Sequence, residues 1–162
     1  YCKVFYPLAY YCAYYSIRAN AFDYEKMAMG RERLEYYIND YKAKKADGTI
    51  SNVEDDELKD MRIVQEMYAR GFEFVPIDIY KAKARSFQII DGKIMPSFKV
   101  ISKVGESAGE SIEIAARDGE FLSKDDLRQR ARIGQTVIEK LGELGLLDGM
   151  AESNQLSLFD VI

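Results

Sequence analysis

The chain has 162 residues, of which 48% are hydrophobic and 31% charged, enough for one well-packed domain or two small ones. It contains no histidine, which excludes histidine-based acid–base catalysis and histidine metal ligands, and its two cysteines are too few for a zinc site. The net charge of −4 argues against a general electrostatic attraction to nucleic acid, so any such contact must be local.

The sequence begins at Tyr1, inside an apolar pattern and without an initiator methionine, so we interpret it as an excerpt from a longer protein. No apolar run is long enough to span a bilayer, and no signal peptide is visible. If Cys2 and Cys12 share one helix they lie about 15 Å apart, too far for a disulfide. We therefore expect two small buried hydrophobic side chains in a reducing compartment.

Residues 1–46 are rich in tyrosine and are predicted to be helical. Pro7 suits a first helical turn, and the apolar residues that follow repeat at helical spacing: Leu8, Tyr11, Cys12 and Tyr15. Asp23 is the expected N-cap of a second helical segment, interrupted at Gly30, whose apolar stripe is Met27, Leu34, Ile38 and Tyr41. The tyrosines could stack on nucleic-acid bases or pack against neighbouring helices, and their helical repeat favours packing.

A loop over residues 46–52 precedes a helix predicted from about Val53 to Arg70. Ser51 and Glu54 form a capping box at its start, and Gly71 with Phe72 ends it. The acidic run 54–57 could suggest a metal site, but acids in a first turn offset the helix dipole, and we favour that explanation. The side chains expected to point inward are Leu58, Met61, Val64 or Gln65, and Tyr68.

The pattern changes to that of a small sheet between residues 72 and 100. Phe74, Val75, Ile77 and Ile79 are typical of a strand broken by Pro76. Residues 87–90 and 93–95 are predicted to pair through a tight Asp91-Gly92 turn. We expect a β element of two or three strands, the one sheet of the chain.

The stretch 101–117, ISKVGESAGESIEIAAR, contains a tight turn at Lys103-Val104-Gly105 before a helix. Gly105 can adopt a positive φ, and Ser107 is the expected N-cap. The N–H groups at such a helix start point outward, so the turn can accept a phosphate without a basic side chain. On this helix we expect small residues on one side and two buried isoleucines: Ala108, Gly109, Ala115, Ile112 and Ile114.

This arrangement occurs a second time downstream. Ser123 to Asp126 form another predicted capping box, for a short helix through Arg132, and the turn at 133–135 precedes a helix over 136–144. Arg132 takes the place of Lys103, and Gly134 that of Gly105. The candidate phosphate-binding residues are therefore Lys103, Val104, Gly105, Glu106, Ser107, Arg132, Ile133, Gly134, Gln135 and Thr136.

The two turns resemble the helix-hairpin-helix motif, which binds DNA backbones without reading sequence. Lys103 departs from the motif, because the family usually has a glycine there. An ordinary connection between helices in a small all-α domain is the alternative.

The last residues form a polar spacer followed by an apolar segment. Gln155-Leu156-Ser157-Leu158-Phe159 is similar to the pentapeptide by which bacterial replication proteins bind the sliding clamp, with Leu158 and Phe159 filling an apolar pocket and Gln155 bonding at its rim. The alternative is a C-terminal strand that packs on the core of the chain.

With both features, nearly the whole chain resembles the C-terminal part of PolC-type bacterial DNA polymerase III alpha subunits. The resemblance rests on Tyr6-Pro7-Leu8 and the tyrosines that follow, on residues 77–80, on residues 119–124 and on the terminal pentapeptide. Ala82 and Lys83 replace serines expected in the family, which puts any polar contact there in doubt.

The resemblance implies a mainly α fold with a small β element. It further implies a helical fingers portion with a β hairpin over residues 1–96, a tandem helix-hairpin-helix domain that binds duplex DNA over 97–150, and a flexible tail over 151–162 that binds the sliding clamp. The catalytic carboxylates and Mg²⁺ of the parent nucleotidyltransferase would lie upstream of Tyr1, so we expect no catalytic residues, no cofactor and no activity here. The resemblance also implies a bacterial protein located in the cytoplasm.

Two other hypotheses stay open. A non-catalytic adaptor or repair factor could join DNA and clamp by the same motifs. A plain helical interaction domain would bind neither.

Overall fold

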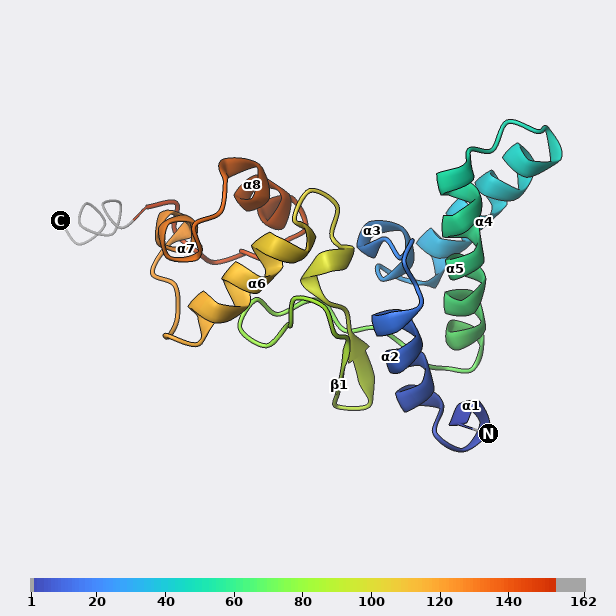
Figure 1. Cartoon of the computed structure of the whole chain (residues 1–162), viewed down its shortest axis with the longest axis horizontal. Helices are drawn as coiled ribbons and strands as arrows, with labels where there is room; N and C mark the ends of the chain where they lie inside the picture. Colours follow the sequence, from blue (N-terminus) through green and yellow to red (C-terminus); the bar gives the residue numbers. More distant parts are fainter. Residues whose placement is uncertain (1, 154–162) are drawn as a thin grey trace. The chain divides into compact units, whose positions relative to one another are not determined.

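The computed structural model describes residues 2–153, with the backbone alone at Cys2. They form two compact units, one made of the residues up to Pro76 with Ser86–Pro96, the other of Ile77–Arg85 with the residues from Ser97 onward. The fold is mainly helical with one small two-stranded sheet in the described part, which confirms the predicted fold class (Figure 1). No helix in the described part is both long and apolar enough to cross a membrane.

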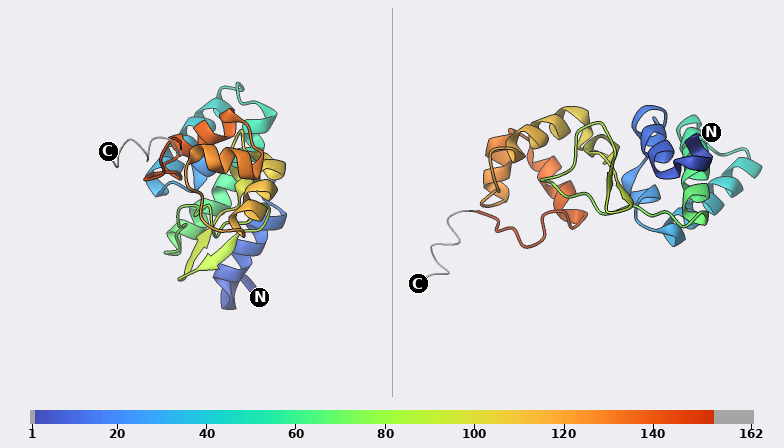
Figure 2. Two further views of the ribbon diagram at one scale, coloured as in Figure 1. Left: turned by 90° about the vertical axis from the view of Figure 1, so that its left-hand side faces the viewer. Right: turned by 90° about the horizontal axis from the view of Figure 1, so that it is seen from below.

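The first unit is a helical assembly with a β-hairpin beside it. Its elements are α1 (Cys2–Phe5), α2 (Pro7–Ile17), α3 (Tyr24–Met27), α4 (Arg31–Ala46), α5 (Asn52–Ala69), β1 (Gln88–Ile90) and β2 (Lys93–Met95). Helices α4 and α5 pack against each other, and α2 contacts both strands (Figures 1 and 2).

Aromatic side chains form much of the core of the first unit. The ring of Tyr15 lies 5.3–5.6 Å, centroid to centroid, from those of Phe22, Phe74 and Phe87. Tyr11 and Tyr15 are 0% and 1% exposed, so these two residues of the predicted stripe pack in the core. Leu8 and Cys12 are only partly buried, so the expectation of a buried Cys12 is wrong. The second stripe is also buried, at Met27, Leu34, Ile38 and Tyr41.

Local capping chemistry places the helix ends as predicted. Asp23 accepts the Lys26 N–H at 3.1 Å, and the Ser51 capping box is complete. Gly71, with φ of 86°, ends α5; its N–H donates to the carbonyl of Tyr68 at 2.9 Å, and the next N–H donates to Met67 at 3.2 Å.

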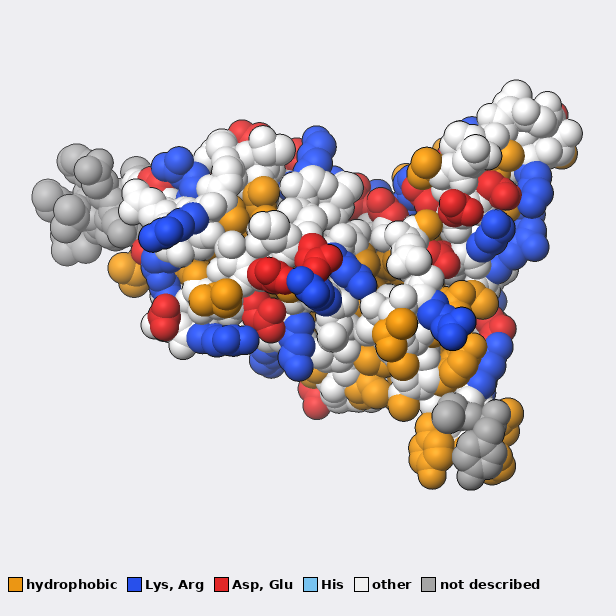
Figure 3. All heavy atoms as spheres, viewed as in Figure 1, with side chains coloured by type: hydrophobic (Ala, Val, Ile, Leu, Met, Phe, Trp, Pro, Cys, Tyr) orange, Lys and Arg blue, Asp and Glu red, His pale blue; other side chains and the backbone are white. Residues whose placement is uncertain are grey.

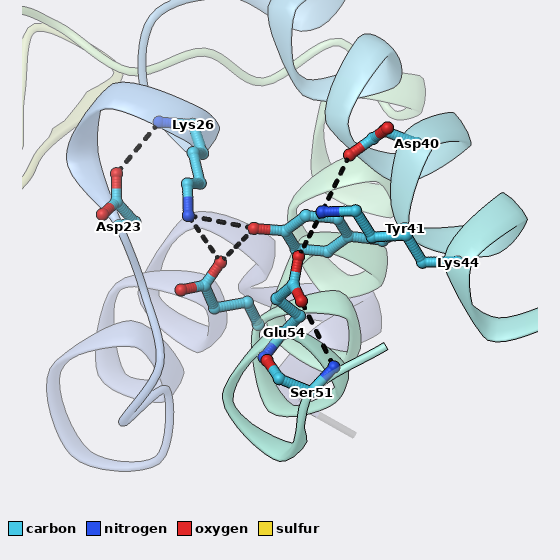
Figure 4. A network of polar contacts seen from close by, with 8 residues as sticks. Asp23, Lys26, Asp40, Tyr41, Lys44, Ser51 and Glu54 are labelled. Atoms are coloured by element: carbon cyan, nitrogen blue, oxygen red, sulfur yellow. Dashed lines mark hydrogen bonds and ion pairs between the residues drawn. The ribbon is translucent and has the colours of Figure 1, made fainter. Parts of the chain in front are cut away.

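The acidic start of α5 is paired with lysines of the neighbouring helices. Glu54 accepts from Lys44 at 2.6 Å, and Glu57 accepts from both Lys26 and Tyr41, at 2.8 and 2.6 Å (Figure 4). Because Glu54 and Asp55 also stand in the first turn of α5, the structure agrees with the capping and dipole explanation that we favoured for this run.

The hairpin has the register that its turn predicts. Ile89 pairs with Ile94, and the turn residues Asp91 and Gly92 have φ of 51° and 77°, the combination that matches strand twist. The expected strand over residues 74–79 is reduced to one parallel bridge between Phe74 and Ile94. Pairing stops there because the next bond of this ladder would need an N–H on Pro96, which has none.

The second unit contains η1 (Phe98–Val100), α6 (Gly105–Ala116), α7 (Lys124–Ala131) and α8 (Gln135–Glu143). Its core is formed by fully buried aliphatic and aromatic side chains, among them Phe98, Ile101, Ile112, Leu127 and Leu141. The segment 77–85 belongs to this unit rather than to the first: the N–H groups of Phe98 and Lys99 donate to carbonyls of Lys83 and Ala84 at 3.0 Å. Ile77 and Ile79 are buried here, each 4% exposed.

Candidate nucleic-acid interface

The first turn is closed by one carbonyl and one buried side chain. After η1, Lys103 adopts a left-handed backbone with φ of 70°, and the Val104 N–H donates to the Ile101 carbonyl at 3.2 Å. The Val104 side chain is buried, whereas Lys103 is exposed. The turn therefore presents a cation to solvent on a fixed backbone.

Helix α6 begins at Gly105, earlier than expected, so the prediction of Ser107 as N-cap is wrong. Val104 occupies the N-cap position and makes no side-chain cap hydrogen bond, and Ser107 is the third helical residue. The N–H of Gly105 also points to the Ile101 carbonyl, at 3.5 Å. The backbone N–H groups left to bind a ligand at this turn are therefore those of Glu106 and Ser107, which have no acceptor within the helix.

The second turn follows the same plan. Arg132 ends α7 with φ of 53°, and the N–H of Ile133 donates to the Arg128 carbonyl at 3.2 Å. Ile133 is buried, and Arg132, Gly134, Gln135 and Thr136 are exposed. Gly134 is the N-cap of α8, and with no side chain it leaves the first amides of that helix without a cap.

The repeat is close but not identical. Lys103 and Arg132 share the left-handed backbone that explains why related motifs have glycine at this position. The glycines differ, since Gly105 has φ of 73° and Gly134 has φ of −79°. The element before the first turn is a single 3₁₀ turn, whereas α7 precedes the second.

At the start of α7, by contrast, the first backbone N–H groups of the helix already have acceptors within the chain. Ser123 accepts the Asp126 N–H at 3.0 Å, and the N–H groups of Lys124 and Asp125 donate to carbonyls of Ala151 and Glu152, at 2.8 and 3.2 Å. The predicted capping box is only half formed, because the Asp126 carboxylate accepts from the Leu122 N–H instead. At the N-caps of α6 and α8, no side chain accepts a hydrogen bond from the first N–H groups of the helix.

The charges around the turns leave the two cations available. Within residues 2–153, neither Lys103 nor Arg132 forms an ion pair. The acid of the first turn, Glu106, is paired with Arg85, which also binds Glu110 at 2.5 Å. The hydrogen bond to Glu110 and the charges of both acids raise the pKa of the Arg85 guanidinium. Sequence reasoning missed Arg85, because nothing in its local pattern indicates a partner on α6.

Close packing fixes α6 against η1. A Cβ on Gly109 would lie 2.7 Å from the Phe98 Cβ and 3.4 Å from the Ala84 Cα, so a side chain does not fit. Ile112 is buried as predicted, but Ile114 is 59% exposed. Residues two apart on a helix point in different directions, which is why both could not face the core.

A second residue that the sequence did not reveal, Arg130, holds the connection between α6 and α7. Its guanidinium donates to the carbonyls of Ala115, Gly119 and Glu120, at 2.9, 3.1 and 2.9 Å. It also lies 4.6 Å from the centroid of the Phe121 ring. Arg130, in the last turn of α7, therefore joins this helix to the end of α6 and to the connection between them.

Both turns fall within a recognised family. Residues 71–156, just over half of the chain, match the sequence model described as the helix-hairpin-helix motif. This chain belongs to the helix-hairpin-helix motif family. The match agrees with the two turns. Each turn has a basic residue with a left-handed backbone conformation, a buried aliphatic residue and a glycine.

Curated relatives of this helix-hairpin-helix chain are bacterial polymerases. It is 44% identical to "DNA polymerase III PolC-type" of Streptococcus suis (strain 98HAH33), over 99% of this chain and 11% of the relative. The same name belongs to proteins of Streptococcus pyogenes serotype M2 and Streptococcus pneumoniae serotype 2, which are 43% and 42% identical over the same shares. The chain is thus homologous to one region of these proteins and spans about a tenth of their length.

The predicted clamp-binding residues, Gln155 to Phe159, lie outside the described residues. Their role stays a prediction from sequence.

Proposed function

We propose that this chain holds duplex DNA by its sugar-phosphate backbone and tethers a replicative DNA polymerase to its sliding clamp. The observation that carries the DNA-binding part is the pair of turns, each with an uncapped helix start next to an exposed, unpaired cation. Backbone N–H groups at a helix start favour anions, and contacts to phosphate carry no sequence information. Such contacts suit a polymerase, which must bind every sequence.

The arrangement also explains how an acidic chain can bind DNA. Binding here depends on a few placed donors rather than on net charge, and the acid nearest the first turn is already paired with Arg85. We expect the loss of affinity with salt to reflect few phosphate contacts, since each contributes to the slope.

Homology to PolC-type proteins supports the polymerase context. We assign residues 1–96 to the fingers, except the segment 77–85 that packs within the second unit, residues 97–150 to the duplex-binding domain and residues 151–162 to the clamp-binding tail. Nucleotidyl transfer, with its Mg²⁺, would be carried out by parts of the polymerase outside these residues. A tail peptide that holds the clamp raises the local concentration of the polymerase on its template, so weak binding can still increase processivity.

Duplex binding is tested with Gly105→Val, using fluorescence anisotropy of a short labelled duplex at low salt. Gly48→Val is the matched control, because Gly48 has nearly the same positive φ, 72°, and lies in the loop between α4 and α5, outside both turns. We expect weaker duplex binding for Gly105→Val alone. Equal affinity of the two variants for DNA would refute the assignment of this turn.

Clamp binding is tested separately by titrating the chain with purified clamp. Replacing Leu158 and Phe159 together by alanine should abolish the complex and leave the unfolding transition unchanged. Clamp affinity that persists in this variant would show that the tail is not the tether.

A further inference from the structure

One helix of the first unit bears two rows of tyrosines, and only one of them is used in the core. Tyr11 and Tyr15 are buried, whereas Tyr6, Tyr10 and Tyr14 repeat every four residues along another side of α2. These three rings line an open groove of about 710 Å³. The residues that complete the groove are Ala9, Ala13, Ile17 and Arg18.

The groove is lined mainly by aromatic side chains and is open to solvent at Tyr6. Tyr6 is 61% exposed, whereas Tyr10 and Tyr14 are half-buried and stack on each other, with centroids 6.2 Å apart and planes inclined by 28°. Two alanines stand between the ring positions on the same side of the helix. Hydrophobic side chains also gather over α2 and the neighbouring hairpin in the space-filling view (Figure 3).

The charges of the groove favour an anionic ligand. Arg18 is the one charged residue among those that line it, and within residues 2–153 it has no ion-pair partner. Arg18 and Tyr14 also line an adjoining cavity, whose charged residues are Lys59 and two acids, Asp56 and Asp60. Towards the other end, the Lys3 ammonium lies 5.7 Å from the centroid of the Tyr10 ring and is paired with Glu66 at 2.6 Å, so Arg18 is the cation left to bind a phosphate.

We propose that this groove binds single-stranded nucleic acid, with unpaired bases stacked on Tyr6, Tyr10 and Tyr14 and a phosphate held by Arg18. A row of aromatic faces accepts any base, because every base has a π-face, and cations along the row follow the backbone. An apolar protein segment fits less well, since it brings no negative charge to the unpaired Arg18 guanidinium. The inference does not depend on the hairpin turns, which would bind duplex.

The test is the affinity of the whole chain for a labelled oligothymidine, measured by anisotropy. Tyr10→Ala with Tyr14→Ala should weaken binding at least about fivefold, the lower end of what one lost stacking contact costs. Tyr10→Phe with Tyr14→Phe keeps both rings and should bind like the unaltered chain. Arg18→Gln should reduce the slope of log affinity against log salt by about 0.7.

Tyr36→Ala is the matched control, because Tyr36 is 67% exposed on α4 and lies outside the groove. Far-UV circular dichroism of each variant shows whether α2 remains folded. Unchanged oligothymidine affinity in the folded double alanine variant, or an equal loss in Tyr36→Ala, would overturn the proposal. Capture of a protein segment by this groove with no oligothymidine binding would also overturn it. Gly105→Val should leave oligothymidine binding intact, so this test and that of duplex binding fail independently.

Discussion

Lys103 and Arg132 hold the same backbone conformation at corresponding positions of two turns, with φ of 70° and 53°. A left-handed conformation costs a non-glycine residue roughly 1–2 kcal/mol. The chain therefore keeps a cation at each turn despite the strain, which agrees with a role for the two side chains in binding rather than in folding.

Replacing either residue by glycine should separate the two effects. We expect Lys103→Gly and Arg132→Gly each to raise the free energy of unfolding in urea by about 1 kcal/mol, because the strain is relieved. Duplex affinity should fall in both. Arg117→Gly is the control, since Arg117 has φ of −67° and should lose stability. A loss of stability in Lys103→Gly would contradict this account of the turn.

Gly109→Ala should destabilise the second unit by about 1–3 kcal/mol, because its Cβ would overlap that of Phe98 and force α6 away from η1. Thermal unfolding measures the effect. Gly142→Ala, in α8, meets no atom within 4 Å and should be neutral or stabilising, as alanine is the better helix former. Similar melting temperatures for the two variants would argue against the close contact.

Arg130→Lys should cost about 2–3 kcal/mol of stability, since a lysine cannot donate to three carbonyls in the fork that a guanidinium provides. The loss should appear in urea unfolding and be accompanied by weaker duplex binding, because the end of α7, from which the second turn continues, is no longer joined to α6. Arg128→Lys is a suitable comparison: its nearest ion pair, to Asp125, is 4.0 Å long. Equal losses of stability in the two variants would contradict the role of Arg130 in joining α7 to α6.

Asp60 should make stability depend on pH. Burial raises the pKa of its carboxyl, although the Ala21 N–H, which donates at 2.9 Å, opposes the shift. The folded chain thus binds this proton more tightly than the unfolded chain, and the free energy of unfolding falls as pH rises from the unfolded to the folded pKa.

Asp60→Asn keeps an acceptor for Ala21 and removes the charge, so it should be more stable at neutral pH and less dependent on pH. Urea unfolding across the acidic range measures both. Asp118→Asn, at an exposed position, is the matched control. A destabilised Asp60→Asn variant would show that the charge itself is needed.

Features set by local chemistry could be predicted from the sequence. The Ser51 box, the Asp23 cap, the Asp91-Gly92 turn and the correspondence of Lys103 with Arg132 each depend on a few adjacent residues. The start of α6 could not be predicted in this way. It depends on which N–H groups donate to the Ile101 carbonyl, and the packing of η1 determines where that carbonyl lies.

Contacts between residues far apart in the sequence could not be predicted either. The Arg85 pair with Glu106 and the ties of Arg130 join segments with no shared periodicity. For α2, helical spacing showed that tyrosines would pack, but it could not show which row would lack a partner.

The central claim is that open amides at the start of a helix bind phosphate, and Gly134 tests it most directly. In Gly134→Ser the hydroxyl can cap the amide of Thr136 or Val137, which should raise stability by about 1 kcal/mol over Gly134→Ala and take up the donors. Both variants add a Cβ that meets no other atom within 4 Å, so only the serine oxygen distinguishes them. The measurement is the duplex affinity of the two variants beside their unfolding free energies. We predict that the serine variant is the more stable and binds duplex more weakly; a serine variant that is more stable and binds duplex as tightly as the alanine variant would contradict the claim.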